Sequence, residues 1–268
     1  MRRAAHALVP PTLLALTLLL PAAARAQSPV ATWTLETVVD RFCVSYLVDP
    51  ALAAKQLGSR FAPVSADRVD GLHPAVAQLV AGEPAYRAWV PAEICVIEAA
   101  RLVSGSRTAS EGARPVIVGY SAIAATPAGG GEVEMRGSLF SSSGSVRRLA
   151  SDQLIHVDGV DYSKGIVPEG TDQRRALEYQ GARLIWDGRI IDPATAASDR
   201  PIVLAVDGKR NRPLTAGVRQ AAEWERSTVG NLKVQGKSDF AAGILGSPIR
   251  MAGPVTGGGS LTLDFSRR

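Results

Sequence analysis

Most of this chain, from Tyr86 to the C-terminus, consists of short apolar or alternating runs separated by Gly, Pro and Asp. This texture is typical of β-strands and turns, because strands bury one face and tight turns need residues that tolerate unusual backbone angles. Two runs, 94–103 and 116–124, are rich in Val, Ile and Ala and flank a polar segment, which predicts a long hairpin. We therefore expect β-structure to form most of the protein.

Three Asp-Gly dipeptides each end an apolar run: Asp158-Gly159, Asp187-Gly188 and Asp207-Gly208. Both central residues of a type I′ turn need positive φ, which Asp tolerates and Gly accepts freely. The pattern predicts that at least two of the three are two-residue hairpin turns. Gly257-Gly258-Gly259 is expected to connect two further strands near the end of the chain.

The segment before Tyr86 has a different pattern. Apolar side chains over 35–47 recur at i, i+3, i+4, i+7 and i+8, which predicts one buried face of an α-helix. Short helices are also predicted over 50–57 and 74–81, and Ser238 is expected to cap another one near the C-terminus.

The whole pattern predicts an α+β fold in which short N-terminal helices pack on a mostly antiparallel β-sheet, a sandwich or a partly closed barrel. Residues 27–85 are the predicted helical segment. Residues 86–268 are the predicted β-rich region, which forms one domain with the segment before it.

Residues 1–26 have the features of a cleavable export signal. Arg2 and Arg3 precede an apolar run over 13–20, and an A-x-A sequence ends at Ala26. Cleavage is predicted between Ala26 and Gln27. The apolar run is about half the length that a membrane-spanning helix needs. The predicted location is periplasmic or secreted, with no transmembrane anchor in the mature chain.

The charge balance argues against a nucleic-acid partner. The net charge of +5 falls to about +2 once the signal is removed, because its arginines leave without any acidic residue. Aromatic residues are only 5% of the chain, and no Lys/Arg cluster is interleaved with rings on which bases could stack. We therefore predict no binding to nucleic acid.

Cys43 and Cys95 are the two cysteines of the chain. Export would place them in an oxidising compartment, where pairing is the default, so a structural disulfide between them is predicted. A redox pair or a metal site is the alternative. Redox motifs keep their cysteines two residues apart, and a metal site needs more ligands than the sequence clusters here.

His156 is the residue with the strongest case for chemistry. A two-residue turn at Asp158-Gly159 would place His156 opposite Asp161 on the polar face of a hairpin. Such a pair could orient a general base for Ser163 or Ser151 in acyl transfer. A cross-strand polar contact is the simpler interpretation, because no G-x-S-x-G or S-x-x-K motif supplies a nucleophile.

The remaining candidates are weaker. Trp186 would lie opposite Arg189 and could form a platform for an anionic ligand, although a surface sheet contact explains the pair as well. His73 precedes Pro74 at a helix start and has no H-x-H or H-E-x-x-H motif around it. The glycine clusters lack the G-K-[ST] ending of a phosphate-binding loop. No metal and no cofactor are predicted.

Function is inferred here from missing catalytic motifs. The first hypothesis is a non-catalytic exported protein that binds a small ligand or an envelope protein. The second is an exported hydrolase or other acyl-transfer enzyme without a recognisable motif, in which His156 and Asp161 form the base pair. The third is a structural or assembly subunit of the cell envelope, which would expose an apolar patch instead of a pocket.

Overall fold

The computed structural model describes residues 30–267, except 71, 73, 167–171, 197–201, 210–211 and 254. The predicted signal, its cleavage site and His73 lie outside the described residues. No helix among the described residues is long and apolar enough to cross a membrane.

The described chain is built mainly of strands. They are β1 (Ala31–Val48), β2 (Phe61–Pro63), β3 (Val90–Ser104), β4 (Arg107–Ala109), β5 (Val116–Pro127), β6 (Glu134–Ser141), β7 (Asp158–Gly159), β8 (Asp161–Ile166), β9 (Gln173–Tyr179), β10 (Ala182–Ala196), β11 (Ile202–Asp207), β12 (Pro213–Ala221), β13 (Trp224–Gly236), β14 (Arg250–Ala252), β15 (Val255–Gly257) and β16 (Ser260–Arg267). The helices are α1 (Pro50–Leu57), α2 (Pro74–Gly82), α3 (Gly144–Asp152) and α4 (Asp239–Leu245), with 3₁₀ turns η1 (Ala66–Arg68) and η2 (Pro84–Tyr86).

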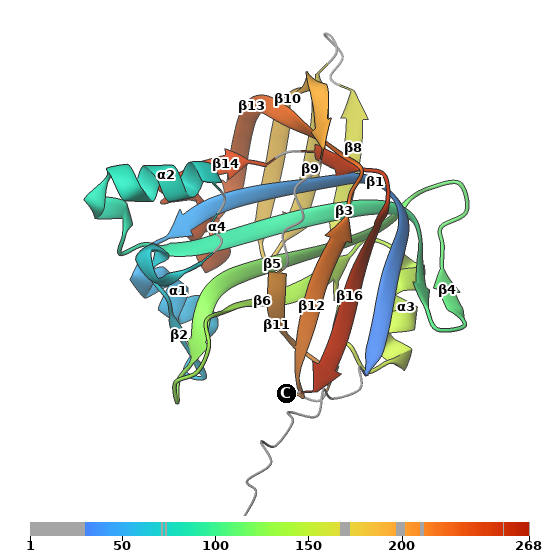
Figure 1. Cartoon of the computed structure of the whole chain (residues 1–268), viewed down its shortest axis with the longest axis horizontal. Helices are drawn as coiled ribbons and strands as arrows, with labels where there is room; N and C mark the ends of the chain where they lie inside the picture. The colour runs from blue at the N-terminus through green and yellow to red at the C-terminus, as the bar shows by residue number, and fades with distance from the viewer. Residues whose placement is uncertain are drawn as a thin grey trace, which may run out of the picture.

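Seven strands close into a barrel. The order is β3, β5, β6, β11, β12, β16 and β1, and β1 pairs with β3 to complete the ring. The neighbours are antiparallel except β6 and β11, which run in parallel. Figure 1 shows the long strands β1, β3 and β5 crossing the front of the molecule, with β12 and β16 below them. Closure gives each of these strands a neighbour on both sides.

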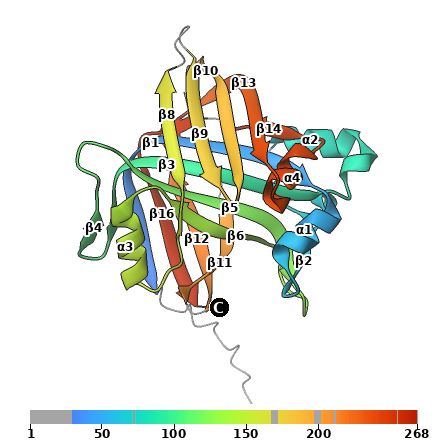
Figure 2. The same ribbon diagram turned by 180° about the vertical axis from the view of Figure 1, so that it is seen from behind.

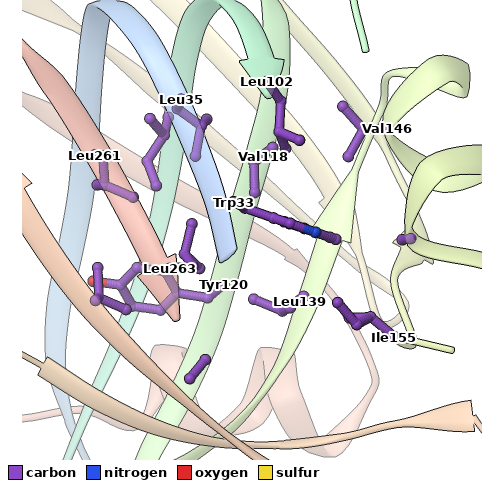
Figure 3. Packing of buried hydrophobic residues seen from close by; sticks show 14 of the residues in the cluster. Trp33, Leu35, Leu102, Val118, Tyr120, Leu139, Val146, Ile155, Leu261 and Leu263 are labelled. Carbon is purple, nitrogen blue, oxygen red and sulfur yellow. The ribbon is translucent and has the colours of Figure 1, made fainter. Parts of the chain in front are cut away.

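The barrel interior is filled by alternate residues of its strands (Figure 3). Trp33 is fully buried, and its ring meets Phe265 edge-on with a centroid distance of 4.9 Å. Its indole N–H donates to Gln153 Oε1 at 2.6 Å, which satisfies the one polar atom of the ring. Val146 and Leu149 of α3 join the same cluster, so this helix covers one end of the barrel.

A second layer of strands covers the outside of the barrel. β13, β10, β9 and β8 continue the sheet from β1 by way of β15 and stand beyond the barrel wall (Figure 2). Between the two layers lies a second apolar cluster, in which Phe42 of β1 meets Trp186 of β10 at 5.1 Å between ring centroids. β1 and β3 therefore bury both of their faces.

The predicted α+β architecture is wrong. The fold is mostly β, and its few helices do not pack on a sheet as a layer. The main error concerns 35–47, which forms part of strand β1 instead of a helix. A bulge between Val38 and Asp40 shifts the strand by one residue, and from Phe42 to Val48 every residue is buried. The bulge and the two-sided burial together produced an apolar spacing that resembles a helix.

The predicted Asp-Gly turns are also wrong as two-residue turns. Asp158-Gly159 forms the short strand β7, parallel to β6. Asp207 is the last residue of β11 and Gly208 follows it, but the next strand begins only at Pro213. Gly188 lies in the middle of β10, where a Cβ atom would stand 2.3 Å from the backbone oxygen of Val229. The glycine is needed there because β13 approaches closely.

Other local predictions are confirmed. α1 begins after Asp49, whose carboxylate accepts from the amides of Ala51 and Leu52, and α2 follows the predicted bounds closely. Ser238 caps α4 by accepting from the amide of Ala241. The long hairpin exists as β3 and β5, which pair antiparallel.

Candidate functional site

The barrel holds a pocket at the end opposite α3. Its volume is about 630 Å³, which suits a small organic ligand. Its walls come from β1, β3, β5, the turn η1 with the start of α2, the start of β6 with the segment before it, and the start of β11. The apolar part of the lining includes Val69, Leu72, Val76, Met135 and Ile202.

Three polar side chains meet at the base of this pocket. Ser45 of β1 and Glu93 of β3 are paired residues in the barrel wall, and Tyr120 of β5 lies opposite Cys95, two residues further along β3. All three point inward because they occupy the inward-facing positions of their strands. Figure 3 shows Tyr120 among the apolar side chains of the barrel interior.

These side chains form one hydrogen-bonded chain with Arg41. The hydroxyl of Tyr120 donates to Glu93 Oε1 at 2.6 Å, and its oxygen accepts from Arg41 Nη2 at 3.2 Å. Ser45 Oγ donates to Glu93 Oε2 at 3.3 Å. Both oxygens of the Glu93 carboxylate are therefore held from inside the barrel.

Arg41 is itself held in place by further hydrogen bonds. Its Nη1 donates to Gln220 Oε1, and the Gln220 amide nitrogen donates to Thr256 Oγ1 at 3.1 Å. Gln220 and Thr256 are buried, so this anchor is protected from water. The guanidinium is thereby held against the tyrosine hydroxyl.

Burial and mutual interaction determine the charge states. Burial, followed by the charge of Glu93, raises the pKa of Tyr120 far above its ordinary value, against a smaller lowering by Arg41. Burial lowers the pKa of Arg41, but Tyr120 and Glu93 raise it by more, so it ends above its ordinary value. The tyrosine is thus a neutral proton donor beside a permanently charged guanidinium.

This arrangement provides the parts of an acid–base site. A carboxylate can accept a proton, a phenol can donate a hydrogen bond or a proton, and a fixed cation stabilises negative charge that develops nearby. Schiff-base chemistry would need a lysine. All five lysines of the sequence lie in described residues, and none of them lines the pocket.

A second polar cluster lies outside the barrel, under the outer sheet. Asp40 Oδ2 accepts from Lys164 Nζ and Arg175 Nη2, each at 2.6 Å. The hydroxyl of Tyr162 donates to Glu98 Oε1 at 2.8 Å, and Lys164 Nζ lies 3.2 Å from the same oxygen. This cluster joins β1 and β3 to β8 and β9 and does not line the large pocket.

Trp186 lies beside this second cluster. The guanidinium carbon of Arg175 lies 5.1 Å from the centre of the Trp186 ring and 4.7 Å from that of Phe42. The predicted partner Arg189 instead lies opposite Val229 in β13. The pairing prediction failed because Asp187-Gly188 does not turn the chain.

His156 and Asp161 are not a pair. His156 Nε2 lies 2.9 Å from Asp158 Oδ1 on the surface, with the His156 side chain 54% exposed. Asp161 lies opposite Glu178 in β9. The predicted register failed because residues 158–159 pair with β6 and do not form a turn. Ser163 lies opposite Ala176 and Ser151 accepts from Lys209, whereas the ring of His156 bonds to Asp158, so neither serine is its hydrogen-bond partner.

Cys43 and Cys95 lie directly opposite each other on β1 and β3. Their Cα atoms are 4.1 Å apart and their sulfur atoms are at disulfide-bonding distance. Both side chains are buried in the barrel interior, where Cys95 is two residues from Glu93. The predicted pairing thus has the geometry that it needs.

Sequence reasoning missed Arg41, Glu93 and Tyr120. A usable signal was present: Glu93 precedes the run Ile94-Cys95-Val96, and Arg41 stands before Phe42-Cys43-Val44. An ionisable residue inside an otherwise apolar strand is costly to bury and indicates a functional or paired group. Interpreting 35–47 as a helix hid that signal for Arg41.

No protein-family model matches the chain, and no curated protein matches it. Solved structures do. The acetoacetate decarboxylase of Legionella pneumophila is 10% identical, over 90% of this chain and 87% of that one, with a TM-score of 0.52. The enduracididine biosynthesis enzyme MppR, complexed with a condensation product of pyruvate, is 14% identical over 89% and 88%, with a TM-score of 0.47. An acetoacetate decarboxylase-like enzyme from Sphingomonas wittichii RW1 is 11% identical over 94% and 96%, with a TM-score of 0.45.

The likeness to the Legionella enzyme establishes the fold. It also corrects the functional expectation, because the fold over 90% of the chain is one used by an enzyme. The prediction of a non-catalytic ligand- or partner-binding protein is therefore wrong.

Proposed function

We propose that this protein is an enzyme whose active site is the barrel pocket, and that it moves a proton at the carbon next to the carbonyl group of a small substrate. Glu93 is the base and Tyr120 is the group that holds the carbonyl oxygen. The observation that carries the proposal is the hydrogen-bonded series of Arg41, Tyr120 and Glu93 at the base of a ligand-sized pocket. The fold neighbour named for acetoacetate, a small oxo acid, is consistent with a carbonyl substrate.

The proposed step begins when the substrate carbonyl reaches Tyr120. The hydroxyl proton turns from Glu93 Oε1 to the carbonyl oxygen, which frees the carboxylate to act as a base. Glu93 then takes the proton from the neighbouring carbon. The electron pair of that C–H bond forms a C=C bond, and the carbonyl oxygen becomes an enolate oxygen. Tyr120 holds this oxygen, and the charge of Arg41 behind it stabilises the enolate.

The experiment is hydrogen–deuterium exchange in D₂O, followed by proton NMR. The substrates are small ketones whose far end carries an ammonium, a hydroxyl or a carboxylate group. Wild-type protein should exchange the hydrogens next to the carbonyl of at least one of them. Glu93→Gln and Tyr120→Phe should each reduce the rate by about a hundredfold or more, the usual scale for losing a general acid or base.

The chain offers matched controls outside the barrel. Tyr162 and Glu98 form a hydrogen bond much like that of Tyr120 and Glu93, at 2.8 Å, but away from the pocket. Tyr162→Phe and Glu98→Gln should leave the exchange rate within about threefold of wild type if only the barrel pair is catalytic. Equal losses in both pairs, or no exchange by wild type with any ketone, would overturn the proposal.

Export belongs to the same proposal. The predicted signal over 1–26 supports it, and the cysteine pair at disulfide-bonding distance is typical of an oxidising compartment. The mature chain would then begin at Gln27 and act in the periplasm or outside the cell on a small molecule. The intact mass of secreted protein tests this point, because a species that keeps the run 13–20 would contradict it.

A further inference from the structure

We infer that the molecule bound in the barrel pocket has a positively charged end, an amine or a guanidine, on an apolar body. This inference rests on the proposed function of the pocket. The cavity of about 630 Å³ with its polar base marks the ligand site. The charges around that cavity then decide which kind of ligand fits it.

The described lining carries more negative than positive charge. It contains four carboxylates and one guanidinium. The charged lining residues are Arg68, Asp70, Glu93, Glu132 and Glu134. A ligand carboxylate would meet like charges, which costs free energy, whereas a ligand cation would gain from them.

The two ends of the pocket differ in charge. At the base, Glu93 is offset by Arg41 through Tyr120, so this end is polar without a strong net charge. At the rim, Asp70 and Glu132 are exposed, and neither makes an ion pair with any residue that the structure describes. The negative charge that faces a ligand is therefore concentrated at the mouth.

Arg136 and Arg60 do not line the pocket and are directed to Asp207. Arg136 donates to Asp207 and also to the backbone oxygen of Ala205, and Arg60 lies 3.8 Å from the same aspartate. Arg68 lines the pocket but is exposed on its turn. The pocket lining therefore has one exposed cation, Arg68, beside the two rim carboxylates, Asp70 and Glu132.

The apolar wall between the base and the rim suits the apolar body of such a ligand. Leu72, Met135 and Ile202 line the pocket together with the polar base and the acidic rim. A ligand with its carbonyl at Tyr120 and its cation at Asp70 and Glu132 places its hydrocarbon body against this wall. The rim charge would also draw cations toward the mouth, an effect that salt weakens.

Three probes of equal length test the charge preference without any catalysis. Butylammonium, butanol and butyrate are titrated into wild-type protein, and binding is followed by saturation-transfer NMR at low ionic strength. Butylammonium should bind about tenfold more tightly than butyrate, with butanol between them. Added salt should narrow the difference. Butylammonium that fails to bind, or that binds no more tightly than butyrate, overturns the inference.

A variant without the two rim charges tests whether Asp70 and Glu132 cause the preference for a cation. In Asp70→Asn/Glu132→Gln, the preference for butylammonium should fall to within about twofold of butanol. Glu83→Gln is the control, because Glu83 is exposed beyond α2 and does not line the pocket. It should bind like wild type. Loss of the preference in Glu83→Gln, or its persistence in the double variant, contradicts the assignment.

The two proposals fail separately. The probes contain no carbonyl group, so their binding does not depend on proton transfer. If ketone exchange requires Tyr120 while the probes show no charge preference, the active site stands and the substrate class is wrong. If butylammonium binds at the rim while no ketone exchanges, the pocket binds cations and the proposed chemistry is wrong.

Discussion

At the scale of single residues, the part of the chain that the structure describes contains two tyrosine–glutamate pairs in different surroundings. Tyr120 and Glu93 face a pocket inside the barrel, whereas Tyr162 and Glu98 are enclosed with Lys164 under the outer sheet. The first pair is open to a ligand. The second is part of an ion network that holds two layers together. Under the proposed function, the same residue types serve chemistry in one place and structure in the other.

The buried ion network gives a prediction about stability. Asp40 and Arg175 have side chains that are each only 2% exposed. Asp40→Asn leaves the guanidinium with a neutral partner away from water, which should lower the free energy of unfolding by about 3 kcal/mol. Urea denaturation followed by circular dichroism measures the change. Glu178→Gln removes the partner of Arg183 from a half-exposed pair and should cost less than about 1 kcal/mol. Similar losses in both variants would contradict this account.

Gly188 gives a second prediction. A Cβ atom there would stand 2.3 Å from the backbone oxygen of Val229, so β10 and β13 would have to separate. Gly188→Ala should therefore lower the free energy of unfolding by about 2 kcal/mol or more. Gly217→Ala in β12 is the control, because no atom lies within 4 Å of its added Cβ. In thermal unfolding, Gly188→Ala should therefore melt at a clearly lower temperature than Gly217→Ala. A Gly188→Ala protein as stable as wild type would show that β10 and β13 are not so close.

At the scale of elements, the sequence predicted the short units and missed the long strand. Caps at Asp49 and Ser238 and the hairpin of β3 and β5 depend on local chemistry, and they were predictable. β1 was not, because a bulge and burial on both faces remove the alternation on which strand prediction depends. The turn predictions at the Asp-Gly dipeptides were wrong for a related reason. Gly188 is required by the close approach of the neighbouring strand and does not lie in a turn.

The link between β1 and β3 can be tested through Cys43 and Cys95. Unfolded, unreduced protein should show no free thiols, because Cys43 and Cys95 lie directly opposite each other on paired strands. The loop closed by this pair spans a sequence separation of 52, so reduction should lower the free energy of unfolding by up to about 4 kcal/mol. Ellman titration in guanidinium, before and after reduction, measures the thiols. Two thiols without reduction would contradict the disulfide.

At the scale of the whole molecule, closure of the barrel explains why the site could not be predicted. Arg41, Glu93, Tyr120 and Gln220 come from four strands spread through the chain, and only the ring order brings them together. No short motif records that order. The sequence predicted that β-structure dominates, but not which strands would be neighbours.

Buried tyrosines give a prediction for the whole fold at high pH. Burial is the largest cause that raises the pKa of four tyrosines well above 10, namely Tyr46, Tyr120, Tyr162 and Tyr179. A raised pKa in the folded state gives stability that is complete below the unfolded value, near 10, and is lost as pH rises beyond it. Tyrosinate absorbance from these residues should therefore appear together with the loss of native circular dichroism. Full tyrosinate absorbance in a protein that keeps its native spectrum would contradict their burial.

The most direct test of the central claim is a crystal structure of the protein with the ketone that exchanges fastest. The account predicts this ligand in the barrel pocket, with its carbonyl oxygen about 3 Å from the hydroxyl of Tyr120 and its other end toward Asp70 and Glu132. Glu93 should then lie within reach of the carbon that exchanges. A ligand bound elsewhere, for example beside Arg175 under the outer sheet, or a ligand in the pocket that does not contact Tyr120, would contradict the account.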